Sequence, residues 1–448
     1  MPSRSRVLAF LVIAYATRVF ADDLREEIPL GTLRSPRLVQ LWDARRAGAG
    51  PAVLARFWQD VARQGTPLLE PIPGDDRHFL VTFLWRGNEA TRGVLILGSI
   101  AQDARMERLP GTDVWYRSYV LRRDLRFTYR LAPVERDLVL DNKDPRYNKG
   151  RIRETAQIDP LNRRRHPPSG DPLLSVAVLP GAPPQPWVAR RPGAPAGRVV
   201  EDEIRSSVLD GRRWIAIYTP PGYRKDAQTP YPLLVVSDGS AYLDLIPLRV
   251  ILDNLIAARR IPPVVAVLVG RPEAEERDRD LACYRPYSDF LAGEVLPWVR
   301  ERYRVTADPA RTVVAGSSQG GLAAACAALA RPELFGNVLS QSGSFMWRPD
   351  GDPAWEWVAR QIRARPKLLL RFYLDVGLLE DAPVEKTGPS LLASNRHLRD
   401  ALQARGYPVW LTEFAGGHGY ANWQGTIVDG LSVLLGGKAP AGKSPRTS

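Results

Sequence analysis

The chain has 448 residues, of which 44% are hydrophobic and 25% are charged. This balance is typical of a soluble globular protein and excludes a disordered chain or a polytopic membrane protein; at about 150 residues per domain, the length predicts two or three domains. Lys and Arg exceed Asp and Glu by 62 to 49, a formal charge of +13 that favours anionic partners in general. Because the charge is spread along the chain, with no basic run interleaved with aromatic residues, we predict no nucleic-acid partner.

The N-terminal residues have the pattern of a secretory signal peptide. Two arginines precede an apolar run over residues 7–16, and Val19 and Ala21 stand at positions −3 and −1 of a cleavage site before Asp22. The apolar run is about half as long as the ~20 residues that a transmembrane helix needs. We therefore expect a signal peptide over residues 1–21, a periplasmic protein and no membrane insertion; a retained signal anchor is the alternative.

Residues 22–150 are predicted to form a β-sandwich domain, because the stretch 50–135 is rich in short runs of β-branched and aromatic residues bounded by turn residues. The expected strands are 79–85, 94–100, 113–121 and 125–131. Residues 151–199 contain many prolines, which resist regular structure, so we predict an extended linker there.

After residue 200, apolar runs without strict alternation are separated by helical patterns, which indicates an α/β domain with a mostly parallel central sheet. The expected strands are 214–219, 233–237, 264–269, 312–315, 337–340, 368–374 and 409–414, and the expected helices are 242–259, 287–303, 320–329 and 391–405. We place this domain at 200–436, followed by a disordered tail over 437–448.

The strongest functional signal is the motif G-x-S-x-G over residues 316–320, centred on Ser318. It lies between a predicted strand and a predicted helix, which is the context of the nucleophile elbow in the α/β-hydrolase fold. The glycines leave room for a sharp turn that lifts the serine hydroxyl above the sheet, and the following helix N-terminus favours negative charge. Ser318 is therefore the predicted nucleophile.

A nucleophilic serine needs a base, and in this fold the catalytic residues follow the order Ser, acid, His. His418 lies in the glycine-rich segment 415–419, directly after the last predicted strand, where a flexible loop can bring the imidazole over the serine. His397 lies within a predicted helix between arginines and is interpreted as a surface residue. His418 is therefore the predicted base.

The acid is expected after the strand 368–374, where three carboxylates occur. Glu380 is the first choice, because Gly377 lets the loop turn and direct the carboxylate back toward the histidine. Asp375, which is nearly continuous with the strand, and Asp381 remain alternatives, as does a Ser–His dyad without a dedicated acid.

An ester hydrolase of this kind also needs backbone N–H groups that stabilise an oxyanion. We expect one from Gln319, which follows the nucleophile, and one from the loop after strand 233–237, where Gly239 and Ser240 are the candidates.

The two cysteines, Cys283 and Cys326, are too few for a disulfide framework in a chain of this length. They could pair in an oxidising compartment, but we expect two buried free thiols. Neither has the Cys/His spacing of a zinc site, so no metal site is predicted.

Motifs from both halves of the chain resemble one known family. In the C-terminal half these are 218–223, 237–239, Arg277 with Asp280-Leu281, 294–298, 316–321, 340–345, Gly377 with Glu380, and 416–418; in the N-terminal half they are 82–86, 106–116 and 159–162. This set resembles the enterochelin (enterobactin) esterases, which are esterase D-like α/β-hydrolases preceded by an N-terminal enterochelin esterase domain. The hydrolase motifs are shared with many carboxylesterases, whereas the N-terminal motifs are more selective.

The resemblance implies hydrolysis of the ester bonds of a ferric catecholate siderophore, a cyclic trilactone, with release of iron. The iron arrives with the substrate, so no cofactor is expected. Because a tris-catecholate iron complex is anionic, four arginines are candidate substrate-binding residues: Arg86, Arg117, Arg126 and Arg277. The alternatives are an exported carboxylesterase of broader specificity, acting on feruloyl or acetyl esters, and a non-catalytic siderophore- or glycan-binding protein.

Overall fold

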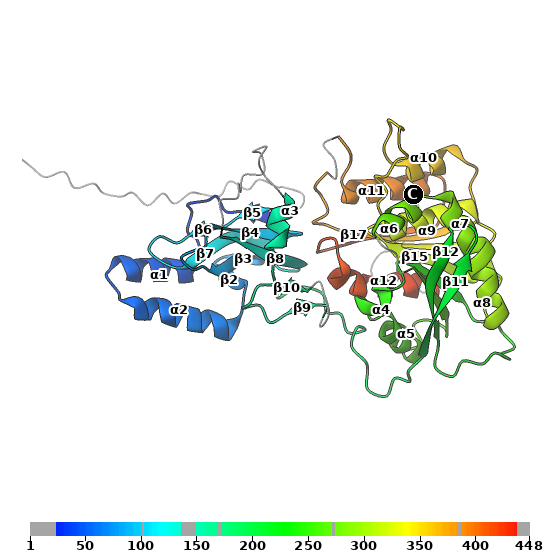
Figure 1. The fold of residues 1–448 in the computed structure, drawn as a ribbon, viewed down its shortest axis with the longest axis horizontal. Helices are drawn as coiled ribbons and strands as arrows, with labels where there is room; N and C mark the ends of the chain where they lie inside the picture. The colour runs from blue at the N-terminus through cyan, green and yellow to red at the C-terminus, as the bar shows by residue number, and fades with distance from the viewer. Residues whose placement is uncertain are drawn as a thin grey trace, which may run out of the picture.

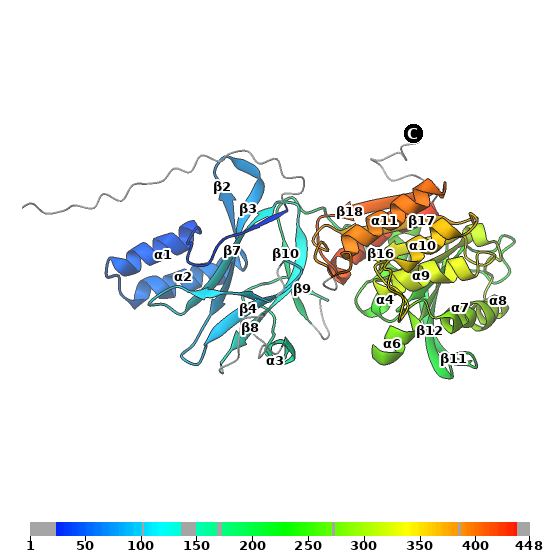
Figure 2. The ribbon, with the colours of Figure 1, turned by 90° about the horizontal axis from the view of Figure 1, so that it is seen from above.

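The computed structural model describes residues 24–100, 103–135, 149–167, 173–270, 274–383 and 387–436. The predicted signal peptide and C-terminal tail lie outside the described residues. Figures 1 and 2 show a β-rich N-terminal domain beside a C-terminal α/β domain.

The N-terminal domain contains two antiparallel sheets. The first has the order β1 (Arg25–Glu27), β7 (Val114–Arg122), β3 (Asp75–Arg86) and β2 (Leu68–Ile72), with β6 (Glu107–Arg108) paired to β7; the second has the order β5 (Ala104–Arg105), β4 (Gly93–Gly98), β8 (Arg126–Val134), β10 (Leu174–Val178) and β9 (Arg165–His166). Phe83 of the first sheet packs edge-on against Tyr129 of the second, with ring centroids 4.9 Å apart, so side chains of both sheets share one core. The four strands expected here are confirmed.

Two helices, α1 (Pro36–Arg46) and α2 (Pro51–Gln64), lie between β1 and β2 and were not predicted. Each begins with proline, whose missing N–H costs nothing at the first helical position. Phe57, Trp58 and Val61 of α2 are buried against the first sheet. The expectation of β-structure from residue 50 was therefore wrong for α2, because its apolar residues follow a helical and not an alternating period.

The predicted linker is only partly a linker. Helix α3 (Lys149–Glu154) overlaps its start, and β9 and β10 lie within it; Ser175–Val178 of β10 pairs with β8. Residues 179–197 contain neither helix nor strand. The proline density therefore indicated the end of this segment correctly, but did not reveal that its first part completes the second sheet.

The α/β domain is built on one eight-stranded sheet. Its order is β11 (Arg198–Ser206), β12 (Gly211–Thr219), β14 (Val265–Val269), β13 (Leu233–Ser237), β15 (Thr312–Ser317), β16 (Asn337–Gln341), β17 (Arg371–Gly377) and β18 (Val409–Phe414). The strands from β14 to β18 are parallel, and β11 and β12 are antiparallel. The seven expected strands are confirmed and β11 is an addition. The central strands β13 to β16 are buried throughout, which explains their apolar runs.

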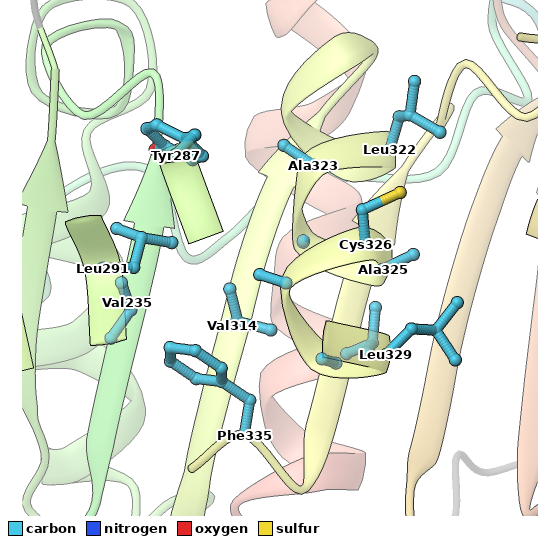
Figure 3. Close-up of a cluster of buried hydrophobic side chains, with 14 of the residues drawn as sticks. Val235, Tyr287, Leu291, Val314, Leu322, Ala323, Ala325, Cys326, Leu329 and Phe335 are labelled. Carbon is cyan, nitrogen blue, oxygen red and sulfur yellow. The ribbon is translucent and has the colours of Figure 1, made fainter. Parts of the chain in front are cut away.

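Helices cover both faces of this sheet. One face is covered by α7 (Arg285–Phe290), α8 (Leu296–Arg302), α9 (Gln319–Ala330), α10 (Trp357–Ala364) and α11 (Leu391–Ala404), and the other by α5 (Leu248–Ala257) and α12 (Tyr420–Leu434); α4 (Ala241–Asp244) and α6 (Ala274–Asp280) are short. Figure 3 shows Leu322 and Leu329 of α9 in the core between α9 and the sheet, together with Val314 of β15. The helix expected over 242–259 is divided into α4 and α5, and the helix over 287–303 contains a π-helical turn at Leu291–Val295.

The two cysteines form a disulfide, which corrects the prediction of free thiols. Cys283 precedes α7 and Cys326 lies on α9, and their Cα atoms are 5.4 Å apart. The two residues are 43 positions apart in the chain, so only the packing of α7 against α9 brings them together.

Among the described residues, no group of three or more His, Cys, Asp or Glu side chains could hold a metal ion. The same part of the chain contains no helix with the length and apolarity needed to cross a membrane.

Candidate active site

Ser318 occupies a sharp turn between β15 and α9. Its backbone has φ 55° and ψ −120°, a strained conformation for a residue with a side chain. The surrounding backbone stabilises the turn, since the Ser318 N–H donates to the Gln341 carbonyl at 2.8 Å. A Cβ at Gly316 would overlap the backbone of Gly320, so the first glycine of the motif is required sterically. The predicted nucleophile elbow is therefore present.

His418 and Glu380 form a hydrogen-bonded pair. The His418 Nδ1 lies 2.9 Å from the Glu380 Oε2, and the side chain of Glu380 is only 2% exposed. The imidazole also packs against the ring of Trp423, with centroids 4.7 Å apart and planes at 82°. This contact and the hydrogen bond fix both the position and the orientation of the imidazole.

The carboxylate of Glu380 is held by further donors. Its Oε1 accepts hydrogen bonds from the Ser342 hydroxyl at 2.6 Å and from the Gly377 N–H at 2.8 Å. The Ser342 hydroxyl in turn accepts from the Trp423 indole N–H at 3.0 Å. An ionised carboxylate is an acceptor only, so these donors satisfy it in the buried site.

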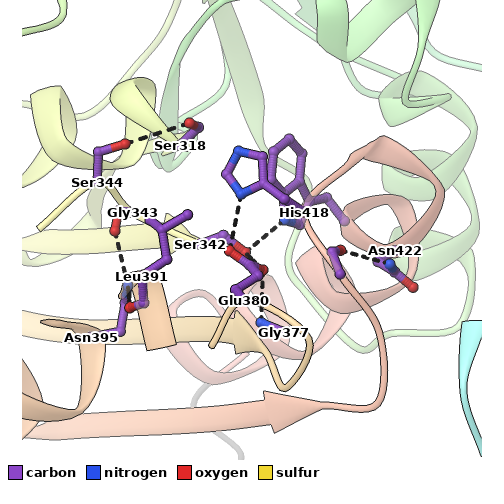
Figure 4. A network of polar contacts seen from close by, with 12 residues as sticks. Ser318, Ser342, Gly343, Ser344, Gly377, Glu380, Leu391, Asn395, His418 and Asn422 are labelled. Atoms are coloured by element: carbon purple, nitrogen blue, oxygen red, sulfur yellow. Dashed lines mark hydrogen bonds and ion pairs between the residues drawn. The ribbon is translucent and has the colours of Figure 1, made fainter. Parts of the chain in front are cut away.

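Ser318 and His418 lie at the same edge of the sheet. The segment that follows β16 links them, because Ser344 approaches the Ser318 hydroxyl, with the two Oγ atoms 3.5 Å apart, while Ser342 binds Glu380. Parallel strands end at a common edge, which places all of these groups together. Figure 4 shows the imidazole on the side of the strands that carries Ser318, with Nε2 turned toward the serine.

Asp375 is not the carboxylate that is hydrogen-bonded to His418. It lies within β17, fully buried, and its Oδ2 accepts from the side-chain amide of Gln341 at 3.3 Å; its Oδ1 has no hydrogen-bond partner among the described residues. Burial raises the pKa of Asp375 to about 7, and the nearby charge of Glu380 adds to the effect. Asp381 is directed elsewhere, in an ion pair of 3.1 Å with Arg25. Glu380, the first choice from the sequence, is therefore the carboxylate that the histidine contacts.

The three predicted oxyanion donors differ in whether their N–H groups already have an acceptor. Gln319 is the first residue of α9, so its N–H has no intrahelical acceptor. The N–H groups of Gly239 and Ser240 donate to the carbonyls of Val269 and Gly270, at 3.0 and 3.2 Å. Both amides are therefore engaged at the end of β14, and a role for either in stabilising an oxyanion stays a prediction.

Arg277 joins the two loops beside the nucleophile. Its guanidinium binds both carboxylate oxygens of Asp238, at 2.8 and 2.7 Å, and the Gln319 side-chain oxygen at 2.6 Å. Asp238 directly follows β13 and has a positive φ of 56°. Arg277 thus connects the loop after β13 to the first residue of α9, a contact that was not predicted from the sequence.

The other predicted substrate-binding arginines have partners in or near the N-terminal domain. Arg86 pairs with Asp113 at 2.9 Å, and the buried Arg117 pairs with Glu27. The guanidinium of Arg126 donates to the carbonyl of Pro183 at 2.7 Å. Their contact with a substrate stays a prediction.

Three residues near the His418–Glu380 pair and Ser318 were not predicted as site residues: Ser342, Ser344 and Trp423. The first two lie in the stretch 340–345, which is one of the motifs of the family resemblance. That motif indicated a functional segment but not the function of these two residues. Trp423 lies on α12, a helix that was not predicted.

A strained serine at a strand–helix turn, a histidine hydrogen-bonded to a buried glutamate and a mostly parallel sheet define a serine hydrolase of the α/β-hydrolase class. The order Ser318, Glu380, His418 along the chain is the order of that class. The protein is a carboxylic ester hydrolase.

Comparison with known proteins identifies the family. Residues 206–434 match the family described as "Putative esterase", and residues 80–188 match "Enterochelin esterase, N-terminal". The chain is 31% identical to the iron(III) enterobactin esterase of Dickeya dadantii, over 87% of this chain and 94% of that one, and 29% identical to the iron(III) salmochelin esterase of Escherichia coli O6:H1, over 86% and 94%. It superposes with a TM-score of 0.69 and 28% identity on the Shigella flexneri enterobactin esterase crystallised in the presence of enterobactin, over 85% of this chain and 98% of that one. The chain belongs to the enterobactin esterase family.

The assignment of the acid predicts unequal effects of two neutral substitutions. Glu380→Gln should lower kcat by about 10³- to 10⁴-fold, because the amide no longer stabilises the imidazolium and favours the wrong tautomer. Asp375→Asn should keep kcat within about threefold of the wild type, since that carboxyl does not contact the histidine. Steady-state hydrolysis of a chromogenic butyrate ester measures both. A loss in Asp375→Asn equal to that in Glu380→Gln would contradict the assignment.

The raised pKa of Asp375 also predicts that the free energy of unfolding depends on pH. Its pKa is about 7 in the folded chain against an ordinary 3.8, so between those values the folded state retains a proton that the unfolded state has released. The contribution of this carboxyl to the free energy of unfolding is therefore largest at low pH. It falls by up to about 4 kcal/mol as the pH rises from about 4 to about 7. Urea unfolding at several pH values should show this fall in the wild type and a smaller one in Asp375→Asn. Parallel profiles for the two proteins would refute the buried carboxyl as the cause.

Proposed function

We propose that this enzyme hydrolyses the trilactone ester bonds of a ferric catecholate siderophore such as enterobactin, and so releases the iron. The single observation that carries the proposal is that both domains of the family are matched in one chain, which also holds a His418–Glu380 pair at the sheet edge of Ser318. The relatives that match most of the chain are iron(III) enterobactin and salmochelin esterases.

The geometry supports a two-step acyl transfer. The Ser318 hydroxyl attacks a lactone carbonyl while the Nε2 of His418 accepts its proton, and Glu380 stabilises the imidazolium that results. The Gln319 N–H, at the N-terminus of α9, faces the developing oxyanion. His418 then returns the proton to the leaving serine alkoxide of the substrate, which breaks the ester bond and leaves an acyl-enzyme. Water deprotonated by His418 cleaves that intermediate and restores Ser318.

The substrate proposal also agrees with the charge of the chain. A tris-catecholate iron(III) complex is a trianion, and the chain carries a formal charge of +13. The iron is part of the substrate, and the proposed reaction needs no resident metal. Hydrolysis of the trilactone backbone removes the covalent link among the catechols, and iron then dissociates more easily.

The two alternatives have weaker support. A broader carboxylesterase would need only the hydrolase domain, whereas residues 80–188 match the enterochelin esterase N-terminal domain. A non-catalytic binding protein would have no use for a strained serine beside a hydrogen-bonded His–Glu pair.

We also propose that the protein is exported to the periplasm. The N-terminal residues have the signal-peptide pattern, and the Cys283–Cys326 disulfide agrees with an oxidising compartment.

The substrate proposal predicts rapid cleavage of iron-loaded cyclic trilactone. Chromatography should show linear and monomeric products, with kcat/KM well above that for a methyl feruloyl ester. Ser318→Ala should reduce hydrolysis by about 10⁴-fold or more and leave binding of the ferric complex, measured by tryptophan quenching, near the wild-type value. Faster turnover of the feruloyl ester would favour the alternative, and unchanged hydrolysis in Ser318→Ala would overturn the mechanism.

The export proposal predicts that the full chain, produced in a Gram-negative host, is recovered from the periplasm with Asp22 as its first residue. Intact-mass analysis after denaturation without reductant should show no free thiol. A variant without residues 2–21 is the control and should remain in the cytoplasm. Recovery of the uncleaved chain from the cytoplasm would refute export.

A further inference from the structure

The loop that carries His418 lies against the N-terminal domain. Figures 1 and 2 both show α12 and its preceding loop on the side of the α/β domain that faces the β-rich domain. The contact is made by backbone, because the Arg126 N–H at the start of β8 donates to the Ala415 carbonyl at 3.0 Å and Arg126 forms a parallel bridge with Gly416. The backbone of residues 415–416, directly before His418, thus pairs with the first residue of a strand of the other domain.

Ser99 makes a second contact, with Gly417, the residue directly before His418. A Cβ built on Gly417 would overlap the Cβ and Oγ of Ser99, while the Ser99 Cα would lie at an ordinary 3.5 Å. Gly417 does not have a left-handed backbone, so its conformation would accept alanine. The side chain of Ser99, and not local backbone geometry, therefore leaves no room at this position.

The loop that carries Glu380 is hydrogen-bonded to the start of the histidine loop. The Leu378 and Leu379 N–H groups donate to the carbonyls of Phe414 and Gly416, at 2.9 and 3.0 Å. Both leucines are buried in the core that contains the aromatic residues of the N-terminal sheets. Acid and base therefore rest on backbone that the N-terminal domain supports.

The remaining side of the histidine loop is also restrained. The amide of Asn422 donates to the Gly417 carbonyl at 2.8 Å, and Gln185, from the segment that follows the second sheet, donates to the Ala421 carbonyl at 2.9 Å. The position of His418 therefore depends on contacts on both sides of its loop.

We propose that Ser99 and Arg126 are positioning residues for the ester hydrolysis, and that through them the N-terminal domain sets the position of His418. This inference rests on the proposed function only in that His418 is the base of an ester hydrolysis; it does not depend on the siderophore. It assigns the N-terminal domain a part in the chemical step, in addition to any contact with substrate.

The test introduces a steric clash between position 417 and Ser99 with one substitution and removes it with a second. Gly417→Ala should push the loop away from Ser99 and lower kcat by about tenfold or more with KM within about twofold, because a misplaced base affects the chemical step. Ser99→Gly in the same chain removes the two atoms that collide, so the double variant should recover to within about threefold of Ser99→Gly alone. Ser99→Gly alone should lower kcat by about two- to fivefold, because the loop then lacks one of its contacts with the N-terminal domain. Gly293→Ala, where no atom lies within 4 Å of the added Cβ, is the matched control.

The measurements use the full chain and a chromogenic butyrate ester, so a wrong siderophore assignment would not affect them. Wild-type kcat in Gly417→Ala would overturn the proposal, since the loop would then be insensitive to Ser99. A double variant as slow as Gly417→Ala would overturn it as well, because the defect would then come from position 417 itself. Recovery in the double variant also answers the objection that Gly417→Ala merely fails to fold.

Discussion

The hydrogen bond between Glu380 and His418 is the interaction on which the rest of the site depends. A carboxylate with 2% of its side chain exposed is costly unless its oxygens accept hydrogen bonds, and here Ser342, Gly377 and the imidazole donate them. Those donors come from three different strand ends, so the pair forms only when β16, β17 and β18 are in register. The geometry of the site therefore forms together with the pairing of these three strands.

The two domains meet where this pair is built. Leu378 and Leu379, on the acid loop, are buried in the core of the N-terminal sheets, and the histidine loop shares backbone hydrogen bonding with β8. A hydrophobic core that spans both domains restrains relative motion more strongly than the polar surfaces usual between domains. The N-terminal domain is therefore part of the scaffold of the active site.

Local chemistry explains which features could be predicted. The G-x-S-x-G turn needs glycines within a few residues of Ser318, and the buried parallel strands need continuous apolar runs, so both are visible in the order of the residues. His418 was predictable because the fold dictates that it follows the last strand. By contrast β10 was hidden in a proline-rich stretch, since its strand character comes from pairing with β8.

The amino-acid sequence alone determined the nucleophile, the base, the fold class and the preference for Glu380, because each follows from residue types at short spacing. Only the tertiary structure excluded Asp375, since its burial within β17 and its contact with Gln341 depend on neighbouring strands. The tertiary structure also engaged the amides of Gly239 and Ser240 with β14 and joined Cys283 to Cys326. In each case the deciding partner is distant in the chain, and spacing carries no information about which distant groups will meet.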